Sequence, residues 1–252
     1  MNITWDAGNY RSNFAFVHTY GKDVLELIDA AKGALVVDLG CGNGELTHEL
    51  KKRGFKVLGL DASREMLAIA REAYPELDFI EGNGLDFTLA DKADAIFSNA
   101  VFHWIDRDRQ DELAENIVRN LKPGGKLVCE FGGKGCAELV HGTLERNFSE
   151  RGLTYPRTFY FPSIGEYASL LERHGFKVEY AVLFDRPTPQ KTRDGLVDWI
   201  NMFVKKPFEN MLPELKRDIL DSVREELKGR LSVDGTWIID YVRIRVRAVY
   251  GG

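Results

Sequence analysis

Short apolar runs alternate with helical segments between residues 34 and 133, and this alternation restricts the fold more than any other feature of the chain. The apolar runs predict strands at 35–39, 56–60, 77–81, 93–98 and 126–131. A repeat of strand and helix is typical of a parallel sheet whose crossover helices cover its faces. The sequence therefore predicts an α/β fold with five strand–helix units.

The segments around these strands also carry readable signals. Leu113, Ile117 and Leu121 recur with helical spacing and predict a helix through residue 121. After residue 133 we expect a helix at 136–148 and one that starts at the capping box of Ser163 and Glu166 and ends at 174–175. A sixth strand is expected at 176–184, two or three helices at 193–228 with Pro213 opening the last, and a closing β-rich run at 236–250.

The length of the chain favours a single globular domain. A chain of 252 residues is near the upper limit for a single core. We therefore expect one domain over 1–252, made of an N-terminal arm and helix (1–33), a cofactor-binding core (34–133) and a substrate-side region (134–252). The oligomeric state cannot be predicted from these patterns.

Charge, hydropathy and cysteines exclude several classes of partner. The net charge is -5, and no lysine-rich or arginine-rich run is present, so nucleic acid is not an expected substrate. No stretch approaches the roughly 18 apolar residues that a membrane span needs, so we expect a cytoplasmic protein without membrane contact. The three cysteines show no Cys-x-x-Cys spacing, so no metal site is expected.

A glycine-rich turn ends the first predicted strand. Residues 36–44 read Val-Val-Asp-Leu-Gly-Cys-Gly-Asn-Gly, and helix-period residues Leu46 and Leu50 follow. Glycines at such a junction let the backbone approach a ligand and expose amides at the positive end of a helix. The turn predicts a nucleotide-like ligand without specifying it.

An acidic residue at the end of the second predicted strand narrows the choice. Asp61 lies 21 residues after Gly40, where a carboxylate can accept both hydroxyls of a ribose. The glycines follow the spacing G-x-G-x-G up to Gly44, whereas a dinucleotide turn has G-x-G-x-x-G. Glu45 would repel a pyrophosphate. A cofactor with a ribose and no phosphate, S-adenosylmethionine, therefore fits better than a dinucleotide.

These residues resemble a known family. Asp38–Gly44 and Asp61–Met66 are similar to motifs one and two of class I S-adenosylmethionine-dependent methyltransferases, and the match extends to Asn99–Trp104 and Leu121–Gly125. Within the class, the chain most resembles the group around trans-aconitate methyltransferase. The resemblance implies a Rossmann-like, doubly wound seven-stranded sheet with an antiparallel last strand and a helical insertion.

The resemblance also implies how the methionine part of the cofactor is held. The backbone of Gly40, Cys41 and Gly42 would approach it, and Asp38 would anchor the turn near its amino group. Asn99 and Ala100, at the end of the fourth strand, would border the sulfonium.

The adenosine part would be held further along the sheet edge. Asp61 would bind the ribose and Met66 would pack against the adenine. Asn83 stands where the family commonly has an aspartate that contacts the adenine amino group, and its amide oxygen can accept the same hydrogen bond. The full set of predicted cofactor-binding residues is Asp38, Gly40, Cys41, Gly42, Asp61, Ala62, Met66, Asn83, Gly84, Asn99 and Ala100.

Three further residues are candidates for the catalytic site. His103 either has a structural role or contacts the substrate, for example as a general base. Tyr10 belongs to an aromatic N-terminal segment that either only packs on the fold or closes over the cofactor, where its ring would attract the sulfonium. Arg243 lies in an alternating strand that, by family topology, begins at the substrate edge, so it either faces solvent or grips a carboxylate bidentately.

Three functions remain open from the sequence. The first is methyl transfer to a small-molecule acceptor, with a carboxylate as the acceptor group that Arg243 would suggest. The second is a nicotinamide-dependent oxidoreductase, which the glycine spacing disfavours. The third is a non-catalytic S-adenosylmethionine-binding protein, which the complete set of cofactor motifs disfavours.

Overall fold

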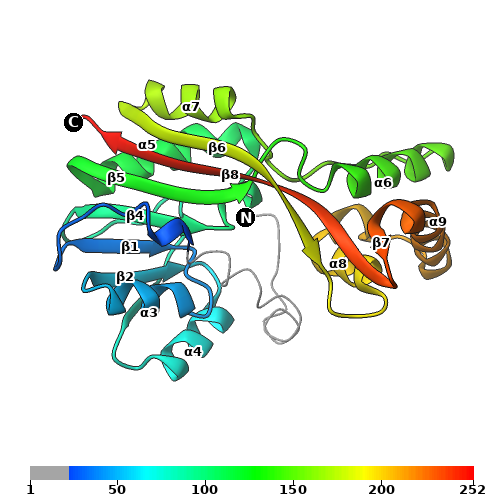
Figure 1. Cartoon of the computed structure of the whole chain (residues 1–252), viewed down its shortest axis with the longest axis horizontal. Helices are drawn as coiled ribbons and strands as arrows, with labels where there is room; N and C mark the ends of the chain where they lie inside the picture. The colour runs from blue at the N-terminus through cyan, green and yellow to red at the C-terminus, as the bar shows by residue number, and fades with distance from the viewer. Residues whose placement is uncertain (1–22) are drawn as a thin grey trace.

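The computed structural model describes residues 23–252, and within them seven strands form one mixed sheet (Figure 1). The strand order is β3-β2-β1-β4-β5-β8-β6. The strands are β1 (Leu35–Leu39), β2 (Lys56–Asp61), β3 (Asp78–Glu81), β4 (Ala93–Asn99), β5 (Leu121–Gly132), β6 (Phe176–Pro189) and β8 (Thr236–Tyr250). β1 to β5 are parallel, and β8 runs antiparallel to its neighbours β5 and β6. The predicted α/β sheet with an antiparallel last strand is confirmed.

Helices cover both faces of this sheet. α3 (Glu45–Lys52) and α4 (Arg64–Ala73) pack on one face, and α5 (Gln110–Asn120) and α7 (Ile164–Arg173) pack on the other. Three 3-10 turns lie at Phe102–Trp104, Arg107–Arg109 and Lys206–Phe208. The doubly wound arrangement leaves the carboxyl ends of β1 to β5 at one edge, which is where folds of this kind bind ligands.

Three further helices form a lobe beyond that edge (Figure 1). They are α6 (Glu138–Glu150), α8 (Gly195–Phe203) and α9 (Pro213–Leu231), and a two-residue strand, β7 (Ser232–Val233), connects α9 to β8. The lobe has its own apolar cluster, in which Leu144, Ile200 and Val223 are fully buried. α8 and α9 constitute the predicted helical insertion.

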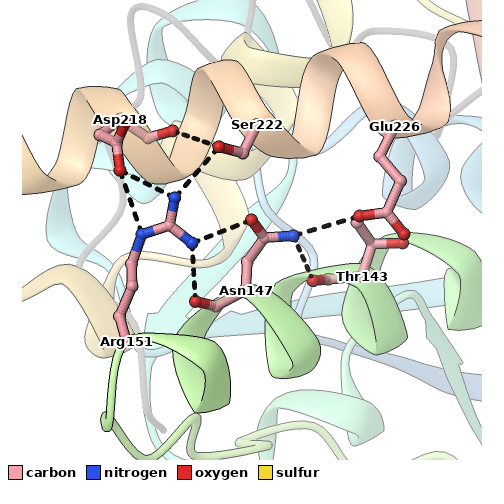
Figure 2. A network of polar contacts seen from close by, with 6 residues as sticks. All are labelled: Thr143, Asn147, Arg151, Asp218, Ser222 and Glu226. Atoms are coloured by element: carbon pink, nitrogen blue, oxygen red, sulfur yellow. Dashed lines mark hydrogen bonds and ion pairs between the residues drawn. The ribbon is translucent and has the colours of Figure 1, made fainter.

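A polar network holds α6 against α9 (Figure 2). Arg151 on α6 donates to the carboxylate of Asp218 at 2.8 Å and to the hydroxyl of Ser222 at 3.1 Å, both on α9. One turn earlier, the amide of Asn147 donates to Glu226 at 3.2 Å. These contacts fix the orientation of the two helices.

Local sequence signals explain where several helices begin. The hydroxyl of Ser163 accepts a hydrogen bond from the backbone amide of Glu166 at 3.2 Å, which confirms the predicted capping start of α7. Ser63 caps α4 in the same way through Met66. Pro213 occupies the first turn of α9, as predicted.

The structure corrects the predicted element boundaries at two main places. Leu121 is extended and begins β5, not the end of a helix, because Pro123 disfavours helical backbone just before it. β6 was expected to end at residue 184 but continues to Pro189, because β8 is long enough to pair with it as far as Ile238. Among residues 23–252, no helix combines the length and apolar character needed to cross a membrane.

Candidate functional site

The glycine turn after β1 is shaped by a close approach to the segment after β4. Gly40, Gly42 and Gly44 all have positive φ angles, of 80°, 55° and 82°. A Cβ atom on Gly40 would lie 2.2 Å from a methyl group of Val101, so no larger residue fits there. The amides of Gly40 and Cys41 both donate to the carbonyl of Leu60, at 2.7 and 3.0 Å. The turn is therefore tied directly to the end of β2.

The carboxylate of Asp61 is held rigidly at this end of β2. One oxygen accepts the Gly42 amide and the other accepts the Ser63 amide, both at 2.8 Å. The side chain is buried, and burial raises the pKa of Asp61 while the amides that donate to it oppose that shift. Each carboxylate oxygen can accept a second hydrogen bond, which is the arrangement that a pair of ligand hydroxyls requires.

A first pocket lies beside Asp61, between the ends of β1, β2 and β4. It brings together five of the predicted cofactor residues with apolar side chains that were not predicted. Its lining consists of Leu39, Gly40, Leu60, Asp61, Ala62, Gly82, Asn83, Gly84, Val101, Phe102, Ile105 and Leu113. A narrow apolar slot with one fixed carboxylate suits a nucleoside.

Asn83 lies at the wall of this first pocket, but its side chain is partly engaged. Its amide oxygen accepts the backbone amide of Leu85 at 3.2 Å. A carbonyl oxygen has two lone pairs, so the predicted bond to an adenine amino group stays a prediction that this geometry permits.

Three other predicted cofactor residues are buried next to the turn and do not line the pocket. Asp38 accepts the hydroxyl of Thr47 at 2.6 Å and so ties β1 to α3, and burial raises its pKa to about 7. The thiol of Cys41 is buried, and burial raises its pKa far above the usual value. Met66 packs against the turn, since its methyl carbon lies 3.3 Å from the position that a Cβ on Gly42 would occupy.

A second pocket shares the segment after β4 with the first, because Ala100 and His103 line the second pocket and Val101 and Phe102 line the first. Ala100 follows β4 with a φ of 62°, a left-handed conformation that is strained for a residue with a side chain. The space measures about 440 Å³ with its open mouth included. It is lined by Ala100, His103, Trp104, Cys136, Phe159, Phe161, Trp199, Phe203, Tyr241 and Arg243. The sheet edge and the helical lobe both contribute to it.

His103 is buried and neutral in this second pocket. Its Nδ1 atom accepts the backbone amide of Gly132 at 3.3 Å, so in the neutral ring the proton is on Nε2. Burial lowers its pKa well below the usual value, and the nearby positive charge of Arg243 lowers it further. The ring is therefore arranged to donate a hydrogen bond through Nε2.

Arg243 places a buried positive charge in the same pocket. Only 7% of the residue is exposed, and its guanidinium carbon lies 4.6 Å from the centre of the Tyr241 ring. Its Nε atom has no hydrogen-bond partner among the described residues. By contrast, Arg245 and Arg186 both pair with the buried Glu130.

Most of the aromatic wall of this pocket was not predicted as part of the site. Phe159 and Phe161 lie in a loop that has no recognisable motif, and Phe161 packs so closely on Gly132 that a Cβ there would be 2.4 Å from its ring. Trp199 and Phe203 lie within the helical segment predicted at 193–228, four residues apart. Their spacing predicts that they are neighbours on the helix, but it does not predict which part of the fold they pack against.

One predicted site residue lies outside the described part of the chain. Tyr10, like the rest of the N-terminal aromatic segment, falls within residues 1–22. Asn99 ends β4 and pairs in register with Glu130 of β5. The predicted contact of Asn99 with a sulfonium stays a prediction.

Known proteins similar to this chain decide its family. A protein-family sequence model described as a methyltransferase domain matches residues 36–125. An uncharacterized methyltransferase of Schizosaccharomyces pombe is 31% identical over 256 residues, which cover 96% of each chain. The chain belongs to the class I S-adenosylmethionine-dependent methyltransferases.

Two other similar proteins agree with this membership. The trans-aconitate 2-methyltransferase of Variovorax paradoxus is 28% identical over 222 residues, which cover 84% of this chain and 83% of that protein. A structure of an S-adenosylmethionine-dependent methyltransferase from Mesorhizobium loti superposes with a TM-score of 0.55 at 18% identity, covering 90% of this chain and 96% of that one. This last similarity shows the fold alone.

The first pocket fits the cofactor of this family. The methyltransferase uses S-adenosylmethionine, which contains a ribose and an adenine but no phosphate. Asp61 offers acceptors for ribose hydroxyls, and Gly40, where the missing Cβ lets Val101 pack against the turn, lines the same pocket. The nicotinamide-dependent alternative is set aside by the family membership.

Proposed function

We propose that this methyltransferase transfers the methyl group to a small-molecule acceptor that carries a carboxylate, and that Arg243 binds this carboxylate. The observation that carries the proposal is the buried guanidinium of Arg243, which no described acidic residue pairs with and which lines the pocket next to the cofactor pocket. A buried charge without a partner is costly, and a ligand carboxylate would compensate it.

The other groups in the pocket support an anionic acceptor. None of the described residues that line it is acidic. A cationic acceptor would therefore meet the charge of Arg243 without a compensating carboxylate. The names of relatives agree, because some of them are trans-aconitate 2-methyltransferases, and trans-aconitate is an anion with carboxylates.

The chain's own residues would act by positioning. S-adenosylmethionine would supply a methyl group bound to a sulfonium, and the acceptor atom would bond to that methyl in line while the thioether of S-adenosylhomocysteine leaves. Arg243 would orient the acceptor through a bidentate contact, and His103 would donate a hydrogen bond from Nε2. A carboxylate acceptor is already deprotonated at neutral pH, so no general base is required. This proposal replaces the alternative of His103 as a base.

The cofactor would be held as the resemblance implies. Asp61 would bind the ribose hydroxyls and Asn83 the adenine amino group, while Asp38 would act near the methionine amino group. The strained backbone at Ala100 would border the sulfonium, because this residue lines the second pocket and is followed by Val101, which lines the first. Each of these roles is part of the proposal.

A turnover screen tests the proposed function directly. Purified protein and S-adenosylmethionine would be incubated with a series of carboxylic acids. For each acid, the amide and the amine with the same carbon skeleton would be tested as well, and the formation of S-adenosylhomocysteine would be measured. We expect turnover with acids and at least tenfold lower kcat/KM with the amides. Equal or better turnover of the amines would contradict the proposal.

A further inference from the structure

We infer that the acceptor is a monoanion in which a single carboxylate is attached to a flat, apolar, unsaturated body. This inference rests on the proposed function and narrows it to one substrate class. It departs from the relatives that are named for trans-aconitate, which carries three carboxylates. The argument depends on the walls of the second pocket and on its charge.

Aromatic rings form most of the pocket walls. Phe159 and Phe161 lie with their planes 6° apart and their centres 5.2 Å apart, and Trp104 packs 4.9 Å from Phe159. Trp199 and Phe203 add two more rings from α8, with centres 5.6 Å apart. Aromatic walls gain most from a flat π-system, which can stack on them or meet them edge to face.

The charge of the pocket matches one carboxylate. Arg243 is the one cationic side chain among the described residues that line it. His103 is neutral, because burial and Arg243 lower its pKa, and the Cys136 thiol is neutral, because burial raises its pKa to about 11. Among the described residues, a second or third carboxylate would find no further cation and would lie against aromatic rings, which is strongly unfavourable.

The same groups disfavour a cationic ligand in this aromatic pocket. Rings of this kind can bind ammonium groups by cation–π contact. Here, however, the guanidinium of Arg243 already lies over the ring of Tyr241, at 4.6 Å. The indole N–H of Trp199 donates a hydrogen bond to the Tyr241 hydroxyl at 2.5 Å and fixes this ring in place. The aromatic surface and the charge thus favour an anion with an aromatic body.

A binding experiment distinguishes this class from the alternatives. Calorimetry on the full chain saturated with S-adenosylhomocysteine would compare four probes, namely trans-cinnamate, 3-cyclohexylpropanoate, trans-aconitate and cinnamylamine. We expect trans-cinnamate to bind at least tenfold more tightly than trans-aconitate and cinnamylamine. It should bind a few fold more tightly than the saturated 3-cyclohexylpropanoate, as expected for aromatic contacts.

The outcomes separate this inference from the proposed function. Tighter binding of trans-aconitate than of trans-cinnamate would overturn the monoanion inference and leave the carboxylate proposal intact. Equal binding of 3-cyclohexylpropanoate would overturn the requirement for a flat body. If cinnamylamine bound best, or if no acid bound, the proposed function would fail as well.

A pair of variants tests whether the aromatic wall carries the preference. Phe159→Leu should weaken trans-cinnamate binding about three- to tenfold, because it removes a ring that lines the pocket. Phe208→Leu is the matched control, since Phe208 is buried in the same lobe but does not line the pocket. Similar losses in both variants, at similar melting temperatures, would contradict a direct contact with Phe159.

Discussion

Arg243 differs from Arg186 and Arg245, which lie on the same pair of strands β6 and β8, because no described acidic residue pairs with it. Arg186 and Arg245 share the buried carboxylate of Glu130, whereas Arg243 has a Tyr241 ring beneath it and an open pocket before it. The ring fixes the guanidinium without cancelling its charge. A side chain so arranged is suited to recognise an anion that is present only during binding.

Replacing Arg243 tests this recognition. In Arg243→Met, kcat/KM for a carboxylate acceptor should fall by about 10² or more, the scale of a lost buried charge pair. The affinity for S-adenosylhomocysteine should stay within about twofold, because the first pocket does not include this residue. Steady-state kinetics and calorimetry would measure the two quantities.

Arg247→Met supplies the control for this substitution. Arg247 lies on the same strand, pairs with Glu179 at 3.2 Å and does not line either pocket. Its replacement should leave kcat/KM within about twofold. Intact turnover in Arg243→Met, or unfolding of that variant, would mean that Arg243 has a structural role and does not bind the acceptor.

The ionisation state of His103 leads to a prediction about pH. Burial lowers its pKa well below 6.5, so the ring stays neutral as the pH falls from 8 to 6 and its protonation does not change in that interval. The ratio of kcat/KM between wild type and His103→Gln should therefore be constant from pH 6 to 8. A ratio that rises with pH around a midpoint near 6.5 would instead show that His103 acts as a general base.

The cofactor affinity of Asp61 variants tests the ribose contact. Asp61→Ala should weaken S-adenosylhomocysteine binding by about 1.5 to 3 kcal/mol, the usual scale of charge-assisted hydrogen bonds. Asp61 also accepts the Gly42 and Ser63 amides, so the melting temperature of the variant has to be measured alongside. An unchanged affinity in a folded variant would place the ribose elsewhere.

The part of the site that the sequence could predict is the part that is local in the chain. Gly40 and Gly42 lie in one turn, and Asp61 closes the next strand, so a short motif describes them. The aromatic wall instead combines Trp104, Phe159 and Trp199, which are far apart in sequence and meet only because the lobe packs on the sheet edge. No spacing rule connects residues whose proximity arises from tertiary packing.

At the scale of elements, predictions succeeded where a residue's own chemistry decides the backbone. Ser163 and Pro213 start helices as expected, because a hydroxyl cap and a fixed φ act locally. Leu121 continues the helical spacing of α5, but its backbone is extended and starts β5, two residues before Pro123. The length of β6 depends on its partner β8, so the pattern within β6 could not give it.

The contact between α6 and α9 carries a stability prediction. Asn147 is 4% exposed and joins Arg151 to Glu226 across the two helices (Figure 2), so Asn147→Ala should lower the free energy of unfolding by about 1 to 3 kcal/mol. Arg224→Met, which removes an exposed pair with Asp221 within α9, should change it by less than about 0.5 kcal/mol. Denaturant titration would measure both, and equal effects would refute a role for the network.

At the scale of the molecule, the two long strands β6 and β8 connect the central sheet to the helical lobe. β8 pairs with β5 from Lys126 to Gly132 and with β6 from Phe176 to Pro189, and both β6 and β8 continue beyond the end of β5 toward the lobe (Figure 1). The second pocket lies where these parts meet, with Ala100 from the sheet edge and Trp199 from the lobe. Its shape therefore depends on how the whole chain folds, and not on the cofactor core alone.

The stability of the whole molecule should report which cofactor it binds. A ligand that binds only the folded state at about 100 times its Kd adds about 2.7 kcal/mol, which for a chain of this size corresponds to a rise in Tm of about 5–10 °C. We expect this rise with S-adenosylhomocysteine. NAD at the same concentration should leave Tm unchanged, because Glu45 stands in the first turn of α3, where a pyrophosphate would have to lie. A comparable rise with NAD, and none with S-adenosylhomocysteine, would contradict the assignment of the first pocket.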